Sequence, residues 1–237
     1  MRPAPWWMRF VPHGVVYDIG ANVGETVREF APLATWVYAF EPNPLCFREL
    51  RKNTADLDNV RLFDCGLSNT IGERVVFTYR HWLLLPVDAA DPRYQHRDYH
   101  PGQRSDLKGE FSAFFTTLDH MAMVLRPPDF LKIDVDGMEW AVLDEARDVL
   151  DWYRPILYLE IGVENMRQYG DEARKLTQLL CHFGYEFVID CYGSPLRATE
   201  AILLADADGV DHDCNVLCVP RGDPRLDQFE APPAEFA

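Results

Sequence analysis

The stretch Val15-Val-Tyr-Asp-Ile-Gly-Ala-Asn-Val-Gly24 decides the fold of this chain. Its first part is apolar and β-branched, which predicts a buried strand over Val15 to Ile19. Gly20 and Gly24 then bear a turn, and a helix is expected over roughly Thr26 to Ala31. A glycine-bearing turn between a strand and a helix lets the backbone approach a ligand closely, and the helix N-terminus attracts an anionic group.

An acid ends the next apolar run. The second strand is predicted over Trp36 to Phe40, and Glu41 follows it, about 20 residues beyond the turn, where an acid typically holds ribose hydroxyls. Dinucleotide binders use G-x-G-x-x-G, whereas this turn has only Gly20 and Gly24, with Asp18 just before it. S-adenosylmethionine (SAM) has no pyrophosphate, but it carries an ammonium for an acid and a carboxylate for the helix N-terminus. The turn therefore favours SAM over a nicotinamide cofactor.

The rest of the chain alternates short apolar runs with segments of helical period, which is typical of βαβ units and a mainly parallel sheet. We expect one domain over residues 1–220, interrupted at 80–110 by an inserted loop or lid rich in His, Arg and aromatic residues. The acidic, proline-rich residues 221–237 are expected to be disordered. Further strands are predicted at 60–63, 74–79, 114–118, 130–133, 156–161, 185–189 and 216–219, and helices from 44, over 138–150 and over 171–183.

The composition of the chain excludes several classes of partner and cellular location. The chain has 237 residues, with 23 Lys and Arg against 38 Asp and Glu, a net charge of -15, which argues against a nucleic-acid partner. No apolar run is long enough to cross a membrane, and prolines and arginines break the N-terminal segment, so we expect neither a membrane partner nor a signal peptide. The six cysteines are not spaced like a disulfide framework, which predicts reduced thiols in the cytoplasm.

The chain resembles the FkbM-type SAM-dependent methyltransferases. The resemblance lies in an ordered set of blocks: Val16-Tyr-Asp-Ile-Gly-Ala-Asn-Val-Gly24, Tyr38-Ala-Phe-Glu-Pro-Asn-Pro44, Cys65-Gly-Leu-Ser68, Thr117-Leu-Asp119, Leu131-Lys-Ile-Asp-Val-Asp-Gly-Met-Glu139, Pro155-Ile-Leu-Tyr-Leu-Glu-Ile161 and Asn215-Val-Leu217. Asp136 departs from the family, which usually has Glu there, and the insert at 80–110 is a second departure.

The resemblance implies a Rossmann-like α/β fold: a mostly parallel, seven-stranded sheet with an antiparallel last strand and helices on both faces. It also implies SAM as cofactor and methyl transfer, usually to a hydroxyl. Carried over by position, one group of residues would bind the methionine end, namely Asp18, Gly20, Ala21, Asn22 and Gly24. Glu41 and Pro42 would lie at the ribose, and Asp64, Cys65 and Leu67 would flank the adenine.

Methyl transfer to an alcohol needs a base or a metal ion, because the acceptor must lose a proton. Asp134 and Glu160 come to the same edge of the predicted sheet. In one hypothesis Asp134 is the base, helped by a histidine of the insert (His81, His96 or His100); in the other, Asp134 and Glu160 hold Mg²⁺. The spacing of Asp136 and Glu139 equally suits capping of the next helix.

The function favoured by these observations is O-methylation of a small molecule, either a sugar or a natural product. A nucleic-acid or protein methyltransferase on the same fold is the alternative, and so is a SAM-binding module that has lost catalysis. The strand predicted over 130–133 is not followed by an Asn-Pro-Pro-Tyr-like tetrapeptide, which argues against a nucleic-acid or protein methyltransferase. The presence of Asp134 and Glu160 argues against a module that has lost catalysis.

Overall fold

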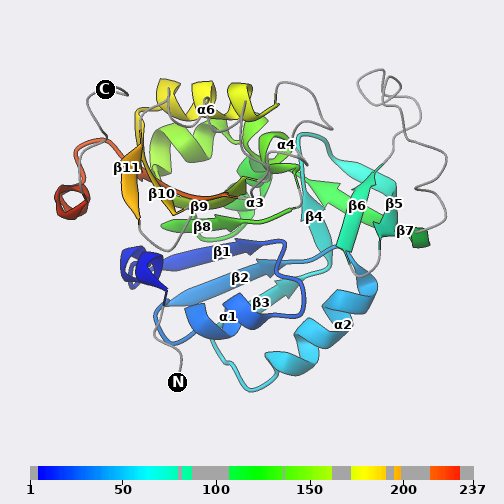
Figure 1. Ribbon diagram of the computed structural model, residues 1–237. Helices are drawn as coiled ribbons and strands as arrows, with labels where there is room; N and C mark the ends of the chain where they lie inside the picture. The colour runs from blue at the N-terminus through cyan, green and yellow to red at the C-terminus, as the bar shows by residue number, and fades with distance from the viewer. Residues whose placement is uncertain are drawn as a thin grey trace.

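The computed structural model is an α/β protein with a large central sheet and a small second sheet beside it (Figure 1). It describes residues 5–79, 82–86, 107–135, 137–161, 172–190, 195–198 and 214–229. No helix among these residues is both long and apolar enough to cross a membrane.

The central sheet has eight strands in the order β11-β10-β12-β9-β8-β1-β2-β3. Their bounds are β1 Val15–Ile19, β2 Trp36–Phe40, β3 Val60–Phe63, β8 Phe130–Ile133, β9 Ile156–Ile161, β10 Tyr185–Asp190, β11 Leu196–Ala198 and β12 Cys214–Pro220. Five neighbours run parallel, from β3 to β9, and β12 is antiparallel to both β9 and β10. The predicted mostly parallel sheet with an antiparallel last strand is confirmed, but β11 adds an eighth strand that the sequence analysis missed.

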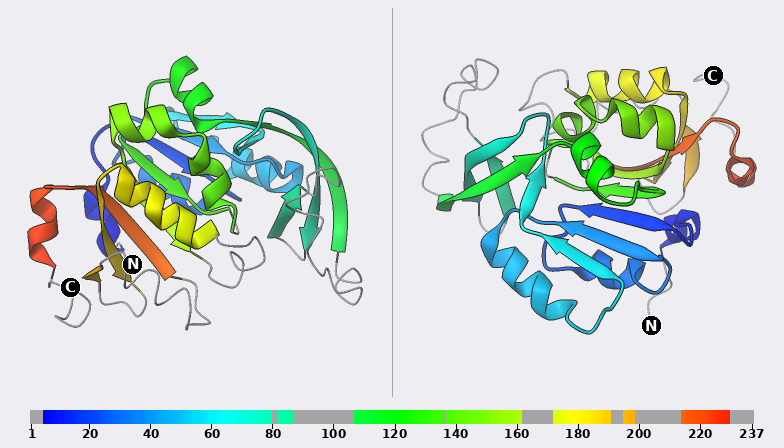
Figure 2. Two further views of the ribbon diagram at one scale, coloured as in Figure 1. Left: turned by 90° about the horizontal axis from the view of Figure 1, so that it is seen from above. Right: turned by 180° about the vertical axis from the view of Figure 1, so that it is seen from behind.

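Helices cover both faces of this sheet, as predicted (Figures 1 and 2). One face carries α1 (Glu25–Phe30) and α2 (Pro44–Asn53), and the other carries α3 (Leu118–Val124), α4 (Glu139–Asp144) and α6 (Glu172–His182). A π-helical turn, η3 (Val149–Tyr153), follows α4 where the sequence predicted one continuous helix.

Alternation along the strands produces two cores. Tyr17 and Ile19 of β1 pack with α3, α4 and α6, whereas Val16 packs with α1 and α2. Both cores are closed to solvent, so the central sheet is a rigid platform. Its parallel strands end at one edge, and the residues that follow these ends make the site described below.

The second sheet corrects the prediction of a loop over 80–110. Its four strands are β4 (Cys65–Leu67), β5 (Gly72–Tyr79), β6 (Trp82–Pro86) and β7 (Leu107–Thr116), in the order β4-β7-β5-β6. Both ends of the predicted loop are therefore strands, and 87–106 lie outside the described residues. A loop was predicted because an antiparallel ribbon with few buried side chains has no clear apolar period.

The disorder predicted for the tail is wrong over residues 221–229. A 3-10 helix, η4 (Pro224–Gln228), begins after Asp223, whose side chain caps it by accepting a hydrogen bond from the Arg225 N–H at 2.9 Å. Leu226 and Phe229 are buried, and the Phe229 ring stacks on Phe10 with centroids 5.9 Å apart. The acidic composition of this segment led to the prediction of disorder, although Leu226 and Phe229 pack against the core. Residues 230–237 lie outside the described residues.

Candidate active site

The turn between β1 and α1 is a close packing contact as well as a ligand-facing loop. Gly20, Asn22 and Gly24 all have positive φ, at 80°, 49° and 91°. A Cβ on Gly20 would lie 1.9 Å from the carbonyl oxygen of Asp134, far inside contact distance. Glycine is required here because the turn presses against the chain that leaves β8. The sequence analysis attributed the glycine to close approach of a ligand, but its nearest neighbour is the protein itself.

Most backbone donors of this turn are already used inside the protein. The N–H groups of Gly20 and Ala21 both donate to the carbonyl of Phe40, at 3.0 and 3.1 Å. The N–H of Gly24 donates to the carbonyl of Ala21, and that of Asn22 to Glu41. These four groups are therefore not free to cradle an anion, and the anion site predicted at the start of the following helix concerns other N–H groups. The role of the four groups is to fix the shape of the turn.

Glu41 is held at the carboxyl end of β2. Its Oε2 accepts a hydrogen bond from the Asn22 N–H at 2.9 Å, and its Oε1 accepts one from the Asn43 N–H at 2.7 Å. The side chain is buried, and burial raises its pKa to about 7 although the two N–H donors and Lys132 pull it down. Each oxygen retains a lone pair, so Glu41 can still accept hydrogen bonds from hydroxyl groups in the cavity.

Three charged groups meet where β1 and β8 end. Lys132 is 5% exposed, and its Nζ lies 3.3 Å from Asp18 Oδ1 and 3.0 Å from Asp134 Oδ2. It also donates to the carbonyl of Gly20 at 3.1 Å. Asp18 is fully buried, and its Oδ2 accepts a hydrogen bond from the Thr26 hydroxyl at 2.6 Å. Asp18 therefore does not line the cavity itself but contacts Lys132, which does.

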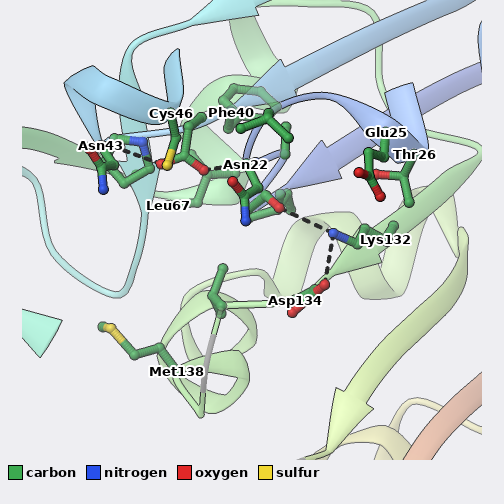
Figure 3. A pocket seen from close by; sticks show the side chains of 18 of the residues that line it. Asn22, Glu25, Thr26, Phe40, Asn43, Cys46, Leu67, Lys132, Asp134 and Met138 are labelled. Atoms are coloured by element: carbon green, nitrogen blue, oxygen red, sulfur yellow. Dashed lines mark hydrogen bonds and ion pairs between the residues drawn. The ribbon is translucent and has the colours of Figure 1, made fainter. Parts of the chain in front are cut away.

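Asp134 points into the site beside Lys132 (Figure 3). Its pKa is lowered: burial opposes ionisation, but Lys132 and a hydrogen bond with Glu160 outweigh it. The two acids that the sequence placed at one sheet edge are thus in contact.

A cavity of about 280 Å³ joins these groups. Of the residues predicted to form the site, those that line it are Gly20, Ala21, Asn22, Glu41, Pro42, Leu67 and Asp134. Those that do not are Asp18, Gly24, Asp64, Cys65 and Glu160. His81, like His96 and His100, lies outside the described residues.

Several lining residues were not predicted. They are Ile19, Val23, Glu25, Thr26, Phe40, Asn43, Cys46, Gly66, Phe115, Lys132, Val135 and Met138. Lys132 was placed on the same strand face as Asp134 by alternation, and its charge beside an acid was the signal that could have identified it. Phe115 comes from the second sheet and packs where Gly66 leaves room, since a Cβ there would lie 2.2 Å from the Phe115 ring. No local pattern indicates that pairing.

Glu139 has a structural place. Its Oε1 accepts hydrogen bonds from the N–H groups of Val135 and Gly137, at 3.1 and 3.3 Å, and so closes the loop between β8 and α4. Burial raises its pKa to about 8. Glu139 therefore holds the loop before the helix and is not a helix cap, since the N-cap of α4 is Met138 and has no side-chain cap hydrogen bond. Asp136 lies outside the described residues. No group of three or more metal-ligating side chains occurs in the part of the chain that the structure describes.

Fold and site together define the class. A parallel sheet closed by an antiparallel strand, with a glycine turn after β1 and an acid after β2, is the arrangement of Rossmann-like methyltransferases, as the resemblance implied. The family model described as the methyltransferase FkbM domain matches residues 18–187. The chain belongs to the FkbM methyltransferase family.

Two similar proteins support this assignment. The chain is 36% identical over 183 residues to the 2-O-methyltransferase NoeI of Sinorhizobium fredii, covering 73% of each chain. Among solved structures it resembles the methyltransferase FkbM of Methylobacillus flagellatus, with a TM-score of 0.53 and 16% identity. That match covers 88% of this chain and 44% of the solved one, so the protein spans less than half of that relative and shares its fold.

Proposed function

We propose that the protein transfers the methyl group of SAM to a hydroxyl group of a small molecule. The observation that carries this proposal is the order of chemical groups along the cavity. Cys46 and Leu67 gather at one end, Asn22 lies midway, and Lys132 with Asp134 occupies the other end (Figure 3). SAM has the same order: a flat apolar base, a ribose, and a charged methionine end.

The described residues fit that cofactor in three places. Leu67 and Phe115 offer apolar surface for adenine, and Glu41 offers lone pairs for the ribose hydroxyls. At the far end Glu25 and Thr26 line the wall, and their side-chain oxygens suit an ammonium group. The cavity lies close to the lower end of the range of about 300–1,000 Å³ that small-molecule sites occupy. The nicotinamide alternative is disfavoured because the turn lacks the G-x-G-x-x-G pattern, and the N–H groups of Gly20, Ala21, Asn22 and Gly24 already have acceptors within the protein.

When bound, SAM supplies an electrophilic methyl group on a positively charged sulfur. The protein must then align the acceptor oxygen and remove its proton. Asp134 is suited to both tasks, because Lys132 keeps it ionised and holds its Oδ2 in place. In this proposal the acceptor hydroxyl donates to Asp134 and would pass its proton to it as the oxygen takes the methyl group, while the sulfur–methyl bond breaks and the neutral thioether leaves. The name of the relative NoeI, a 2-O-methyltransferase, supports oxygen as the methylated atom.

The test begins with calorimetric titration of the purified protein with SAM, its demethylated product S-adenosylhomocysteine (SAH) and NAD⁺. We expect binding of SAM and SAH, and NAD⁺ binding alone would overturn the proposal. Isotope-labelled SAM is then offered with a panel of methyl glycosides and phenols, with Mg²⁺ and with a chelator. Loss of turnover in the chelator would assign Asp134 and Glu160 to a cation instead.

The matched variant is Asp134→Asn, which keeps the shape of the side chain and removes its basicity. We expect SAM affinity near that of the wild type and turnover lower by about 10²–10⁴-fold, the usual contribution of a general base. A variant with wild-type turnover would exclude Asp134 as the base. Binding of SAM without transfer to any member of the panel, or to RNA and protein substrates, would favour the inactive module.

A further inference from the structure

The buried ammonium of Lys132 is not accounted for by the fold. Lys132 sits in the strand β8, between β1 and β9, with 7% of its side chain exposed. Burying an ammonium is expensive, and apolar replacements of buried ion pairs are often as stable or more so. Phe130, two residues earlier on the same strand face, is buried in the apolar core, so the lysine departs from the character of its own face. Stability alone therefore gives no reason for a lysine.

The three partners of Lys132 belong to three different parts of the site. Asp18 ends β1, Gly20 begins the turn, and Asp134 follows β8. The ammonium donates a hydrogen bond to the Gly20 carbonyl and forms ion pairs with Asp134 and Asp18. Asp18 already has the Thr26 hydroxyl, so one further donor would satisfy it. The contacts to Gly20 and Asp134 connect the turn to the acid that faces the cavity.

We propose that Lys132 is a positioning residue for methyl transfer, which holds Asp134 ionised and fixed against the Gly20 turn. This inference rests on the proposed function, because the role of Asp134 belongs to that proposal. Two further contacts support a single unit: the Asp134 N–H donates to the Ile19 carbonyl at 3.1 Å, and the Asp134 carbonyl closely approaches Gly20. The acid and the turn are thereby held in one place relative to each other.

The charges around Asp134 show what the loss of Lys132 would do. Asp18, Glu160 and Glu139 also face this region, and all three are acids. Lys132 is the cation that contacts Asp134 among the described residues. Without it, burial would favour the protonated form of Asp134, and the Oδ2 of Asp134 would lose the partner that fixes it. An acid that is already protonated cannot take the proton of an acceptor hydroxyl.

The experiment separates this role from simple neutralisation of Asp18. Asp18→Asn keeps an oxygen for the Thr26 hydroxyl and no longer needs a cation. The double variant D18N/K132M is compared with D18N alone, so the difference reports the contacts of Lys132 to Asp134 and Gly20. The first measurement uses cofactor-free protein: ¹³C NMR titration of the Asp carboxyl groups, with the Asp134 signal assigned from D134N. We expect its titration midpoint to be higher in the double variant by at least one pH unit.

The second measurement is methyl transfer to whichever panel acceptor the wild type accepts. We expect kcat of D18N/K132M to be about 10²-fold below that of D18N, near the lower end of what a general base contributes. SAH affinity and thermal midpoint should change much less. Equal kcat and an unmoved Asp134 titration in the two variants would overturn the inference, and Lys132 would be only the counter-ion of Asp18.

Two safeguards keep the test decisive. If the double variant does not fold, K132A is assayed with added ethylammonium, which should restore kcat, whereas ethanol should not; failure of this rescue in a folded variant counts against the inference. If the wild type binds no SAM or transfers no methyl group, the proposed function fails on its own evidence. The NMR titration then still decides whether Lys132 controls the ionisation of Asp134.

Discussion

Replacing Gly20 by alanine tests the contact on which the geometry of the site depends. Two costs arise from the structure: an alanine Cβ at φ of 80°, and a Cβ 1.9 Å from the Asp134 carbonyl oxygen. The first costs about 1–2 kcal/mol, offset by about 0.4–1 kcal/mol because alanine restricts the unfolded chain. The second is overpacking against backbone, which typically costs about 1–3 kcal/mol.

Gly222 provides a matched control. Its φ is 87°, close to that of Gly20, but a Cβ there meets nothing within 4 Å. Gly222→Ala should therefore lose about 1 kcal/mol of the free energy of unfolding or less. Gly20→Ala should lose about 1–3 kcal/mol more, equivalent to a thermal midpoint lower by roughly 2–4 °C per kcal/mol.

Urea denaturation gives the free energies, and calorimetry with SAH gives the effect on the site. Gly20→Ala should also weaken SAH binding, because relief of the clash must move either the turn or the backbone of Asp134. Gly222→Ala should leave SAH binding unchanged. Equal losses of stability in the two variants, or unchanged SAH affinity in Gly20→Ala, would show that the close approach of turn and strand end does not shape the site.

Three further predictions follow from buried acids and caps. Burial raises the pKa of Glu139 to about 8, so between pH 4.5 and 8 the folded protein keeps a proton that the unfolded chain has lost, and the free energy of unfolding should fall as pH rises through that window. Glu139→Gln should flatten this fall in urea titrations, and a wild type equally stable at both ends would contradict the assignment. Burial raises the pKa of Glu41 to about 7, so SAH affinity should decline as pH drops below that value. Glu41→Gln should bind about 10–100-fold more weakly above pH 7, because an amide replaces a charged acceptor, and the difference should shrink as the wild-type carboxyl is protonated. Calorimetry that shows a pH-independent affinity in the wild type would exclude this role. Asp119 accepts hydrogen bonds from the Asp148 and Val149 N–H groups at 3.1 and 3.0 Å. Asp119→Ala should therefore lower the free energy of unfolding by about 0.5–2 kcal/mol in urea denaturation, and Asp119→Asn should lower it less. Equal losses in the two variants would mean that these hydrogen bonds contribute nothing.

The central sheet was predictable because its signals are local. Val15–Ile19, Trp36–Phe40 and Phe130–Ile133 are short apolar runs, and their bounds agree with the prediction to the residue. Glu41 and Asp134 each come directly after one of these strands, so parallel pairing brings both to the carboxyl edge of the sheet. Resemblance to a family supplied the same arrangement from a separate argument.

What could not be predicted depends on contacts between distant segments. The N–H groups of the turn are used by Phe40 of the neighbouring strand, which no pattern within the turn indicates. Lys132 and Asp18 become partners because β1 and β8 pair in register, 114 residues apart along the chain. Phe115 enters the cavity through the pairing of β4 with β7. Each of these requires the assembled sheet.

The two walls of the cavity differ in the size of the apolar core behind them. The wall made by Gly20, Glu41 and Asp134 belongs to the central sheet, which two large cores hold from both faces. The wall that bears Phe115 belongs to the small sheet, whose described core consists of Val76, Ala113 and Phe115 with Phe111 beside them. Regions with few buried apolar contacts open at a lower free energy than central strands. Substitutions in the small sheet that leave Leu67 and Phe115 in place should therefore change cofactor affinity little, whereas substitutions at the strand ends of the central sheet should lower it.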